Sequence, residues 1–206
     1  MVGRENPISV RSKRLITDAL IELMGEKAFS KISIRDIVER AGLTRQTFYH
    51  NFDSKEEVLL HKSDELFDDF FQYLTDNEVS DLEGVICLYF RYWQNNDEFI
   101  RMLIDNNLVF LLENRYPQYY DLVQLIYFRG KDFTGTETEY LYAAICGAIV
   151  NLLVVWVKTG ETMSPKEMSA FVMGLFEGRL YDLYLPKEER RERLRDVTKY
   201  KRTISK

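Results

Sequence analysis

The sequence contains few residues that break regular structure or cross-link a chain. Its 206 residues include only 4 prolines, 10 glycines and 2 cysteines. The scarcity of breakers favours long helices over a β fold with many turns, and no internal repeat or low-complexity tract interrupts the chain. Cys87 and Cys146 lie far apart within apolar segments, which favours buried thiols over a disulfide or a metal pair.

The chain also lacks an export signal and the common catalytic signatures. Arg4 and Glu5 interrupt any early apolar run, so we expect a protein of the reducing cytoplasm. The patterns G-x-S-x-G, G-x-x-x-x-G-K-[ST], G-x-G-x-x-G and H-E-x-x-H are absent. The two histidines, His50 and His61, do not form a familiar metal site with two distant cysteines. We therefore expect no enzyme, no bound metal and no cofactor.

The formal net charge of −5 is distributed unevenly along the chain. Residues 1–60, called the head below, carry 10 Lys and Arg against 9 Asp and Glu, whereas residues 61–206, the body, carry 18 against 24. The last segment, 187–206, carries 9 against 4, which is typical of either a basic arm or a solvated helix. An acidic body on a near-neutral head is compatible with DNA binding when the head's cations share one face.

One segment, residues 140–157, has 18 residues without a formal charge, which is near the length that spans a bilayer. Gly147, Asn151 and several alanines make a membrane span the weaker interpretation. The favoured interpretation is a helix buried on all sides, either within the body or against a partner subunit. We therefore expect no contact with a membrane.

The head carries the pattern of three successive helices. Apolar residues at helical spacing form one stripe over residues 12–26. Ser33 is placed to cap a second helix, with Asp36 three residues later, and Gly42 permits the left-handed conformation that ends a helix. Thr44 is placed to cap a third helix that extends to residue 52.

The third helix is predicted to have two different faces. Phe48 and Phe52 lie four residues apart and point towards the core. The polar residues left on the outside are Arg45, Gln46, Thr47 and His50. A short helix, a turn with glycine and a second short helix form a helix-turn-helix, whose second helix carries the side chains that reach base edges in DNA.

A fourth helix is predicted to start after Ser54. The sequence Ser54-Lys55-Glu56-Glu57 is a capping box, in which the serine and the later glutamate satisfy free backbone N–H groups. The helix start and the Lys55 cation together predict a phosphate clamp, although a solvated surface cation is the alternative. This helix is predicted to continue to residue 74, so that it connects the head with the body.

Residues 11–60 resemble the DNA-binding domain of the TetR/AcrR family of bacterial regulators. The stretch IVERAGLTRQTFYHNF at 37–52, followed by DSKE at 53–56, is similar to the family pattern almost position by position. The resemblance implies an all-α fold, in which a long helix joins a three-helix helix-turn-helix domain to a helical effector-binding and dimerisation domain. We place the first domain at 9–69 with its motif at 33–52, the second at 70–186, and the basic tail at 187–206.

The resemblance also implies roles for particular residues. The predicted DNA contacts are Ser33, Thr44, Arg45, Gln46, Thr47, Tyr49, His50 and Lys55. Family members usually contact phosphates from the positions of Thr44, Tyr49, His50 and Lys55, and face bases from those of Arg45, Gln46 and Thr47. Side-chain chemistry would pair Arg45 with guanine and Gln46 with adenine. Alternatives stay open for Tyr49, as a half-buried core aromatic, and for Thr44, as a helix cap alone.

The body is predicted to hold helices at 80–95, 97–105 and 107–128, a loop at 129–136, and long helices at 137–158 and 165–184. Capping boxes are predicted at Ser80 with Glu83 and at Ser164 with Glu167. In the resembled family the last two helices of each subunit form the dimer, whose symmetry matches a palindromic operator. The predicted dimer contacts are Ala144, Gly147, Ala148, Trp156, Phe171, Gly174, Leu175 and Gly178.

Aromatic residues are frequent in the body, and such a set at helical spacing is more typical of a plain core than of a ligand site. The resembled family nevertheless commonly binds an effector among these helices. The predicted pocket comprises Tyr89, Phe90, Trp93, Phe110, Tyr127, Cys146 and Asn151. For Asn151 the alternative is a hydrogen bond between subunits that fixes the dimer register.

The overall prediction is a homodimeric transcriptional repressor that an unidentified small molecule releases from its double-stranded DNA operator. The alternative is a co-regulator that uses the same fold to bind a protein partner. The near-neutral charge of the head supports the alternative, whereas the polar face of the third helix favours DNA.

Overall fold

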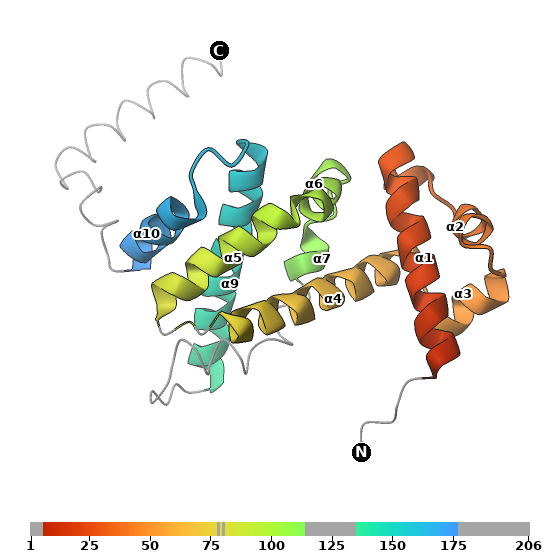
Figure 1. Ribbon diagram of the computed structural model, residues 1–206, viewed down its shortest axis with the longest axis horizontal. Helices are drawn as coiled ribbons and strands as arrows, with labels where there is room; N and C mark the ends of the chain where they lie inside the picture. Colours follow the sequence, from red (N-terminus) through yellow and green to blue (C-terminus); the bar gives the residue numbers. More distant parts are fainter. Residues whose placement is uncertain (1–5, 78, 80, 114–134, 177–206) are drawn as a thin grey trace, which may run out of the picture.

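The computed structural model describes residues 6–77, 79, 81–113 and 135–176, and all regular elements in these ranges are helices (Figure 1). The all-α fold that the sequence predicts is therefore confirmed. The head lies at one end of the molecule and the body at the other. One long helix, α4 (Lys55–Asp76), runs from the head into the body.

The head begins with α1, which is longer than predicted. Its elements before α4 are α1 (Pro7–Glu26), the short 3-10 helix η1 (Phe29–Lys31), α2 (Ile34–Ala41) and α3 (Arg45–Asn51). α1 begins at Pro7 rather than at Ser12, because the side-chain oxygen of Asn6 accepts the N–H of Ile8 at 3.0 Å. Pro7 suits the first position of a helix, since it has no N–H that would need a partner there.

The caps that the sequence predicts for α2 and α3 are confirmed. The Ser33 hydroxyl accepts the N–H of Asp36 at 3.2 Å, and the Asp36 carboxylate accepts the N–H of Ser33 at 2.9 Å. Gly42 follows α2 with a φ of +67°, the left-handed conformation. The Thr44 hydroxyl accepts the N–H of Thr47 at 3.1 Å and so starts α3. Local contacts therefore fix both ends of the turn between the two helices.

One apolar core holds α1, α2 and α3 against the start of α4. Its fully buried members come from all four helices: Ile16, Leu20, Ile37, Phe48, Val58 and Leu59. Burial of one such side chain stabilises the folded state by roughly 1.5–3 kcal/mol, whereas an exposed ion pair contributes about 0–1 kcal/mol. The position of α3 is thus set mainly by apolar packing.

The second half of α4 belongs to the body. Leu66, Phe67 and Phe70 are buried there, and the Tyr92 hydroxyl donates to the carbonyl of Leu66 at 2.7 Å. Burial, with a smaller effect of the nearby Asp69 carboxylate, raises the pKa of Tyr92 to about 12, so the phenol stays a neutral donor. The predicted domain boundary after residue 69 falls inside this continuous helix.

The remaining helices of the body pack around α5. They are α5 (Leu82–Asn95), α6 (Asp97–Asp105), α7 (Phe110–Glu113), α9 (Gly135–Lys158) and α10 (Pro165–Phe176). α5 packs against α4 and α10, and α9 contacts α6 and α7. α5 is capped by the Asp81 carboxylate, which accepts the N–H of Gly84 at 2.7 Å, whereas the predicted cap, Ser80, lies outside the described residues. The predicted capping box of Ser164 and Glu167 is present at the start of α10.

Several predicted segments lie outside the described residues. They are residues 114–128 of the helix predicted at 107–128, most of the predicted loop at 129–136, the end of the last predicted helix at 177–184, and the basic tail at 187–206.

α9 contains the long apolar run, and one chain buries only one side of it. Val150, Leu153 and Val157 are buried in the body, whereas Tyr140 is 73% exposed and Val155 is 57% exposed. None of the helices in the described ranges is long and apolar enough to cross a membrane. The single chain therefore leaves the face with Val155 open, so the first alternative, burial on all sides within the body, is wrong, and burial against a partner subunit stays a prediction.

Replacing Gly42 with alanine is expected to lower the free energy of unfolding by about 1–2 kcal/mol, because an L side chain is strained at a positive φ. Among the described residues no atom lies within 4 Å of the added Cβ, so strain in the backbone accounts for the effect. Gly25→Ala is the matched control, since its site in α1 is equally open and helical, and it is expected to stabilise by roughly 0.5–1 kcal/mol. Urea unfolding followed by circular dichroism measures both, and effects of the same sign would contradict this account.

Candidate nucleic-acid interface

α3 presents a polar face because two aromatic residues anchor its other side. Phe48 and Phe52 are buried in the head, with their ring centroids 6.1 Å apart. Tyr49 packs edge-on against Phe48 at 5.6 Å, yet its side chain is 57% exposed, so it is not a core aromatic. The other exposed residues of this face are Arg45, Gln46 and His50. The guanidinium of Arg45, the amide of Gln46 and the imidazole of His50 are planar groups that can donate N–H hydrogen bonds to base edges or phosphates.

The hydroxyls of Ser33 and Thr44 are both engaged as helix caps. Ser33 caps α2, and Thr44 caps α3 while lying 2.9 Å from the Thr47 hydroxyl. Both residues are exposed. Hydroxyl oxygens have a second lone pair and a rotatable proton, so capping leaves each able to donate to a phosphate. Their contact with DNA stays a prediction.

Lys55 is not the free cation that the sequence suggests. Its ammonium donates to the carbonyls of Phe29 at 2.7 Å and Ile32 at 2.9 Å, and it lies 4.2 Å from the centroid of the Phe29 ring. The first turn of α4 brings Lys55 to these two carbonyls, and the carbonyl of Phe29 also accepts the N–H of Ile32 at 3.0 Å. An ammonium has three N–H donors, so one is left for a phosphate.

The start of α2 is fixed to the end of α1 by a charged pair. The Asp36 carboxylate accepts from the Lys27 ammonium at 3.0 Å and from the backbone N–H of Ser33 at 2.9 Å. The backbone N–H of Ser33, followed by Lys27, lowers the pKa of Asp36 to about 2. Asp36 therefore stays charged at neutral pH, and this contribution to stability is lost only as the pH falls from about 4 towards 2.

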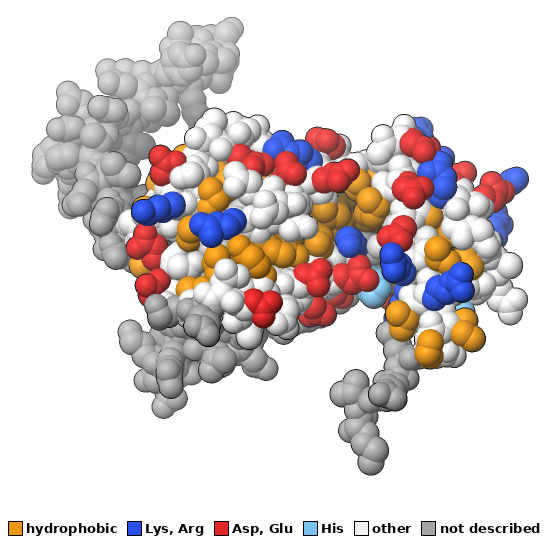
Figure 2. All heavy atoms as spheres, viewed as in Figure 1, with side chains coloured by type: hydrophobic (Ala, Val, Ile, Leu, Met, Phe, Trp, Pro, Cys, Tyr) orange, Lys and Arg blue, Asp and Glu red, His pale blue; other side chains and the backbone are white. Residues whose placement is uncertain are grey.

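Four cations in the described part of the head form ion pairs with neighbouring carboxylates. The ion pairs are Arg14 with Asp18, Lys27 with Asp36, Arg35 with Glu39, and Arg40 with Glu22 and Glu26. Figure 2 shows Lys and Arg side chains on the head with Asp and Glu side chains beside them. Arg45 forms no ion pair with any residue in the described ranges. Although the net charge of the head is close to zero, the guanidinium of Arg45 at the start of α3 is thus not neutralised by any described residue.

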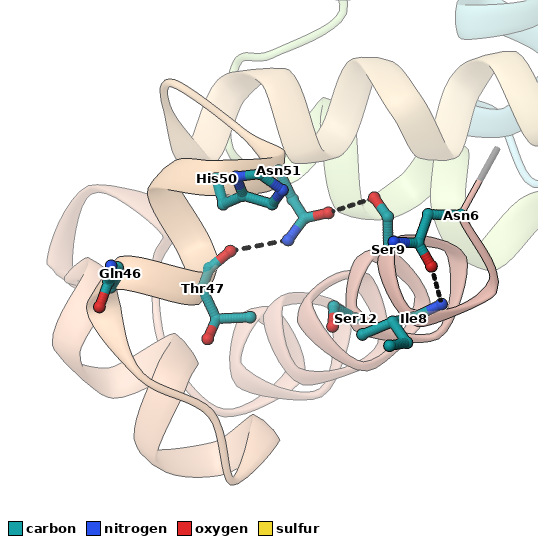
Figure 3. A pocket seen from close by; sticks show the side chains of 8 residues that line it. All are labelled: Asn6, Ile8, Ser9, Ser12, Gln46, Thr47, His50 and Asn51. Atoms are coloured by element: carbon teal, nitrogen blue, oxygen red, sulfur yellow. Dashed lines mark hydrogen bonds between the residues drawn. The ribbon is translucent and has the colours of Figure 1, made fainter.

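A hollow of about 250 Å³ lies between the first turns of α1 and the exposed side of α3 (Figure 3). Its lining residues are Asn6, Ile8, Ser9, Ser12, Gln46, Thr47, His50 and Asn51. The Ser9 hydroxyl donates to the Asn51 side-chain oxygen at 2.6 Å, and the Asn51 amide donates to the Thr47 carbonyl at 2.7 Å. Asn51 therefore fastens the end of α3 to the start of α1.

The sequence interpretation missed Ser9, Ser12 and Asn51. Ser9 and Asn51 are 42 residues apart, so no local spacing relates them. Ser12 did leave a signal, since it places a hydroxyl on the side of α1 that packs inward, where an apolar residue would be expected.

The predicted effector residues do not all meet. Tyr89, Phe90 and Trp93 are buried in one aromatic cluster, and Cys146 is buried in the same core. Phe110 is 49% exposed, and Tyr127 lies outside the described residues.

Asn151 does not point into the core either. It is exposed and donates to the Gly147 carbonyl of its own helix at 2.8 Å. Phe110 and Asn151 are thus exposed in the single chain, since helical spacing alone does not tell which face of a helix turns inward, and the effector role of the set stays a prediction.

The predicted dimer residues divide in the same way. Ala144, Ala148 and Phe171 are exposed on α9 and α10, and Gly147 lies between them. Trp156 is instead buried within its own chain, where it packs against the Phe90 ring at 5.2 Å and donates to the Met163 carbonyl at 2.8 Å.

Two more of the predicted dimer residues lie away from the open surface. Gly174 is buried and Leu175 half-buried, whereas Gly178 lies outside the described residues. Trp156 and Gly174 are thus packing residues of the single chain.

A direct hydrogen bond joins the head to the body. The N–H of Phe29 donates to the side-chain oxygen of Asn106 at 2.7 Å, and the Asn106 amide donates to the Met102 carbonyl at 2.9 Å. α6 is also fixed to the end of α9, since Arg101 donates to Glu161 at 2.7 Å and to the Val157 carbonyl at 3.3 Å. A displacement of α6 would therefore act on the head and on α9 together.

Comparison with known families agrees with this arrangement. Residues 16–61 match the family described as "Bacterial regulatory proteins, tetR family", and residues 80–178 match "Transcriptional regulator C-terminal region". The chain belongs to the TetR family of transcriptional regulators. The family predicted from residues 37–56 is thus confirmed, and so is the function of a transcriptional regulator.

Individual relatives share the architecture at low sequence identity. The chain is 29% identical to the HTH-type dhaKLM operon transcriptional activator DhaS of Lactococcus lactis, over 75% of this chain and 95% of the relative. The crystal structure of Lin0861 from Listeria innocua aligns with a TM-score of 0.72 at 14% identity, covering 86% of this chain and 95% of the other. The fatty acid degradation regulator FadR from Bacillus halodurans aligns with a TM-score of 0.55 at 18% identity, covering 84% and 95%.

Proposed function

We propose that this regulator is a cytoplasmic homodimer, that α3 of each head enters the major groove of a palindromic operator, and that a small molecule bound in the body changes its affinity for DNA. The observation that carries the proposal is the exposed polar face of α3 on a rigidly packed helix. The DNA-binding unit is residues 9–69, and the effector-binding and dimerisation unit is residues 70–186.

The polar face of α3 supplies the chemistry for reading bases. Arg45 can donate two hydrogen bonds to guanine, and Gln46 can bond in the same bidentate way to adenine. Thr47 would also face the bases, and backbone contacts would come from the remaining predicted residues: Ser33, Thr44, Tyr49, His50 and the third N–H of Lys55. Because Phe48 and Phe52 anchor the helix, these groups are held in place before DNA arrives.

Fluorescence anisotropy with the DNA upstream of the chain's own gene tests this proposal. The wild-type protein is expected to bind that duplex at least about a thousandfold more tightly than an unrelated duplex. Arg45→Ala is expected to weaken specific binding roughly 10- to 100-fold, because a bidentate base contact is lost, and to leave non-specific binding nearly unchanged.

Arg91→Ala is the matched control, since Arg91 is an exposed arginine on α5 in the body. It is expected to bind both duplexes like the wild type. Equal, weak binding to the two duplexes that Arg45→Ala does not alter would contradict the operator proposal. That result would favour the co-regulator alternative, which a pull-down with the full chain would then examine.

The open face of α9 and α10 supports the homodimer. Small residues recur on α9 at Ala144, Gly147 and Ala148, and the apolar side chains of Val155 on α9 and Phe171 on α10 are exposed. Small residues let helices approach closely, and an exposed apolar face of this kind marks an interface.

Ala148→Arg is expected to turn the dimer into a monomer, because a long charged side chain would stand where two helices meet. Light scattering at micromolar protein is expected to give about twice the chain mass of 24.5 kDa for the wild type and the single mass for the variant. Gln72→Arg, on the exposed side of α4, is the control and should remain dimeric. A wild-type protein of single mass would exclude the homodimer.

Two observations support a ligand-responsive body. The buried indole N–H of Trp93 has no acceptor in the described part of the chain, so a bound molecule with a hydrogen-bond acceptor would satisfy it. α6 is also bonded to both the head and α9, so a ligand that displaces α6 would change the placement of the heads. Repression is the usual mode of the family and is the mode we propose, although the Lactococcus relative is by name an activator.

A further inference from the structure

Ser12 is a buried polar residue that helix packing does not explain. Its side chain is only 7% exposed, on the side of α1 that faces α3. The hydroxyl takes part in no hydrogen bond with the described residues, although a serine in a helix can usually bond to its own backbone. Unlike the fully enclosed hydroxyl of Thr17, the hydroxyl of Ser12 opens onto a hollow, so a ligand or water can bond to it there.

The hydroxyl of Ser12 lines the hollow between α1 and α3. Across the hollow lie the Gln46 amide and the His50 ring, both of which can donate hydrogen bonds (Figure 3). The Asn51 side chain is already used, since its oxygen accepts from Ser9 and its amide donates to Thr47. These bonds hold the two walls of the hollow at a fixed separation.

The charge of the lining selects the kind of ligand. No Asp or Glu is among the residues that line the hollow. The N-terminus of α1, a helix of 20 residues, opens at its edge and carries the positive end of the helix dipole. Donors without a carboxylate, at the positive end of a helix, favour an anion over a cation.

The size and position of the hollow identify the anion. About 250 Å³ is several times the roughly 30 Å³ that one water occupies, so a phosphorus atom with its four oxygens fits. Gln46 and His50 belong both to the hollow and to the exposed face of α3. A DNA strand whose bases meet α3 would therefore run its backbone past this opening.

We propose that the hollow receives one phosphodiester group of the operator backbone, with the Ser12 hydroxyl and the amino end of α1 facing its charged oxygens. This inference rests on the proposed function, because it requires α3 to lie in the groove of DNA. It adds a contact from α1 to those made by α3 and α4, and it accounts for the unpartnered hydroxyl of Ser12.

Ser12→Ala tests the proposal in the full-length protein. Alanine keeps the helix and removes only the hydroxyl, so the variant is expected to unfold in urea like the wild type or later. Its affinity for the upstream duplex and for an unrelated duplex is expected to fall by the same factor, about tenfold, because a phosphate contact carries no base sequence. Thr17→Val is the matched control, since Thr17 is also a buried hydroxyl residue of α1, but its hydroxyl is fully enclosed, has no partner among the described residues and does not line the hollow.

The phosphate itself is located with duplexes that carry a neutral methylphosphonate at one backbone position at a time. At one position the neutral group is expected to weaken binding of the wild type about tenfold and to have no further effect on Ser12→Ala. Wild-type affinity of Ser12→Ala, or identical methylphosphonate profiles for the two proteins, would overturn the proposal. So would competition by inorganic phosphate without any position-specific loss, because the anion would then be a free one.

The same binding measurements distinguish failure of the proposed function from failure of the phosphate site alone. If the wild type binds no DNA, both the operator proposal and the phosphate site are overturned. If Arg45→Ala loses specific binding while Ser12→Ala binds like the wild type, only the phosphate site is overturned.

Discussion

Phe29 lies where the head meets the body and makes three contacts, one of them to the body. Its N–H donates to Asn106 of the body, its carbonyl accepts from Lys55, and its ring lies under the Lys55 ammonium. α1 has just ended, α4 begins and α6 ends near this residue, so its hydrogen bond adds a second link between head and body beside the continuous helix α4. A buried N–H that loses its partner costs about 1–3 kcal/mol, so α6 cannot move away freely without Phe29 following. This gives the body a direct means of changing how α3 is presented to DNA.

The helix-turn-helix could be predicted from the sequence because its contacts are local. The caps of Ser33 and Thr44 reach only three residues ahead, and Gly42 determines the turn by its own backbone. The exposed and buried sides of α3 follow from the spacing of Phe48 and Phe52. By contrast, the contacts that complete the site link residues far apart in the chain, and no pattern in the sequence relates them. The pairs are Lys55 with Phe29 and Ile32, Ser9 with Asn51, and Phe29 with Asn106.

The body was harder to predict for a physical reason. Its helices are apolar over most of their circumference, so the spacing of apolar residues does not tell which side faces the core and which faces a partner. Trp156 and Asn151 show the ambiguity. Trp156 is predicted at the dimer interface but is buried in its own chain, whereas Asn151 is predicted in the pocket of the body but is exposed. Only the packing of α9 against α6 and α7 decides between the two sides.

Amide hydrogen exchange at Phe29 tests the connection between head and body most directly. In Asn106→Ala, the Phe29 amide is expected to exchange about tenfold faster than in the wild type, since its acceptor is lost, while the Leu20 amide in α1 keeps its rate. Asn95→Ala, at an exposed site on α5, should change neither rate. An unchanged rate at Phe29, or an equal acceleration at Leu20, would show that Asn106 does not hold Phe29 to the body and would contradict the account.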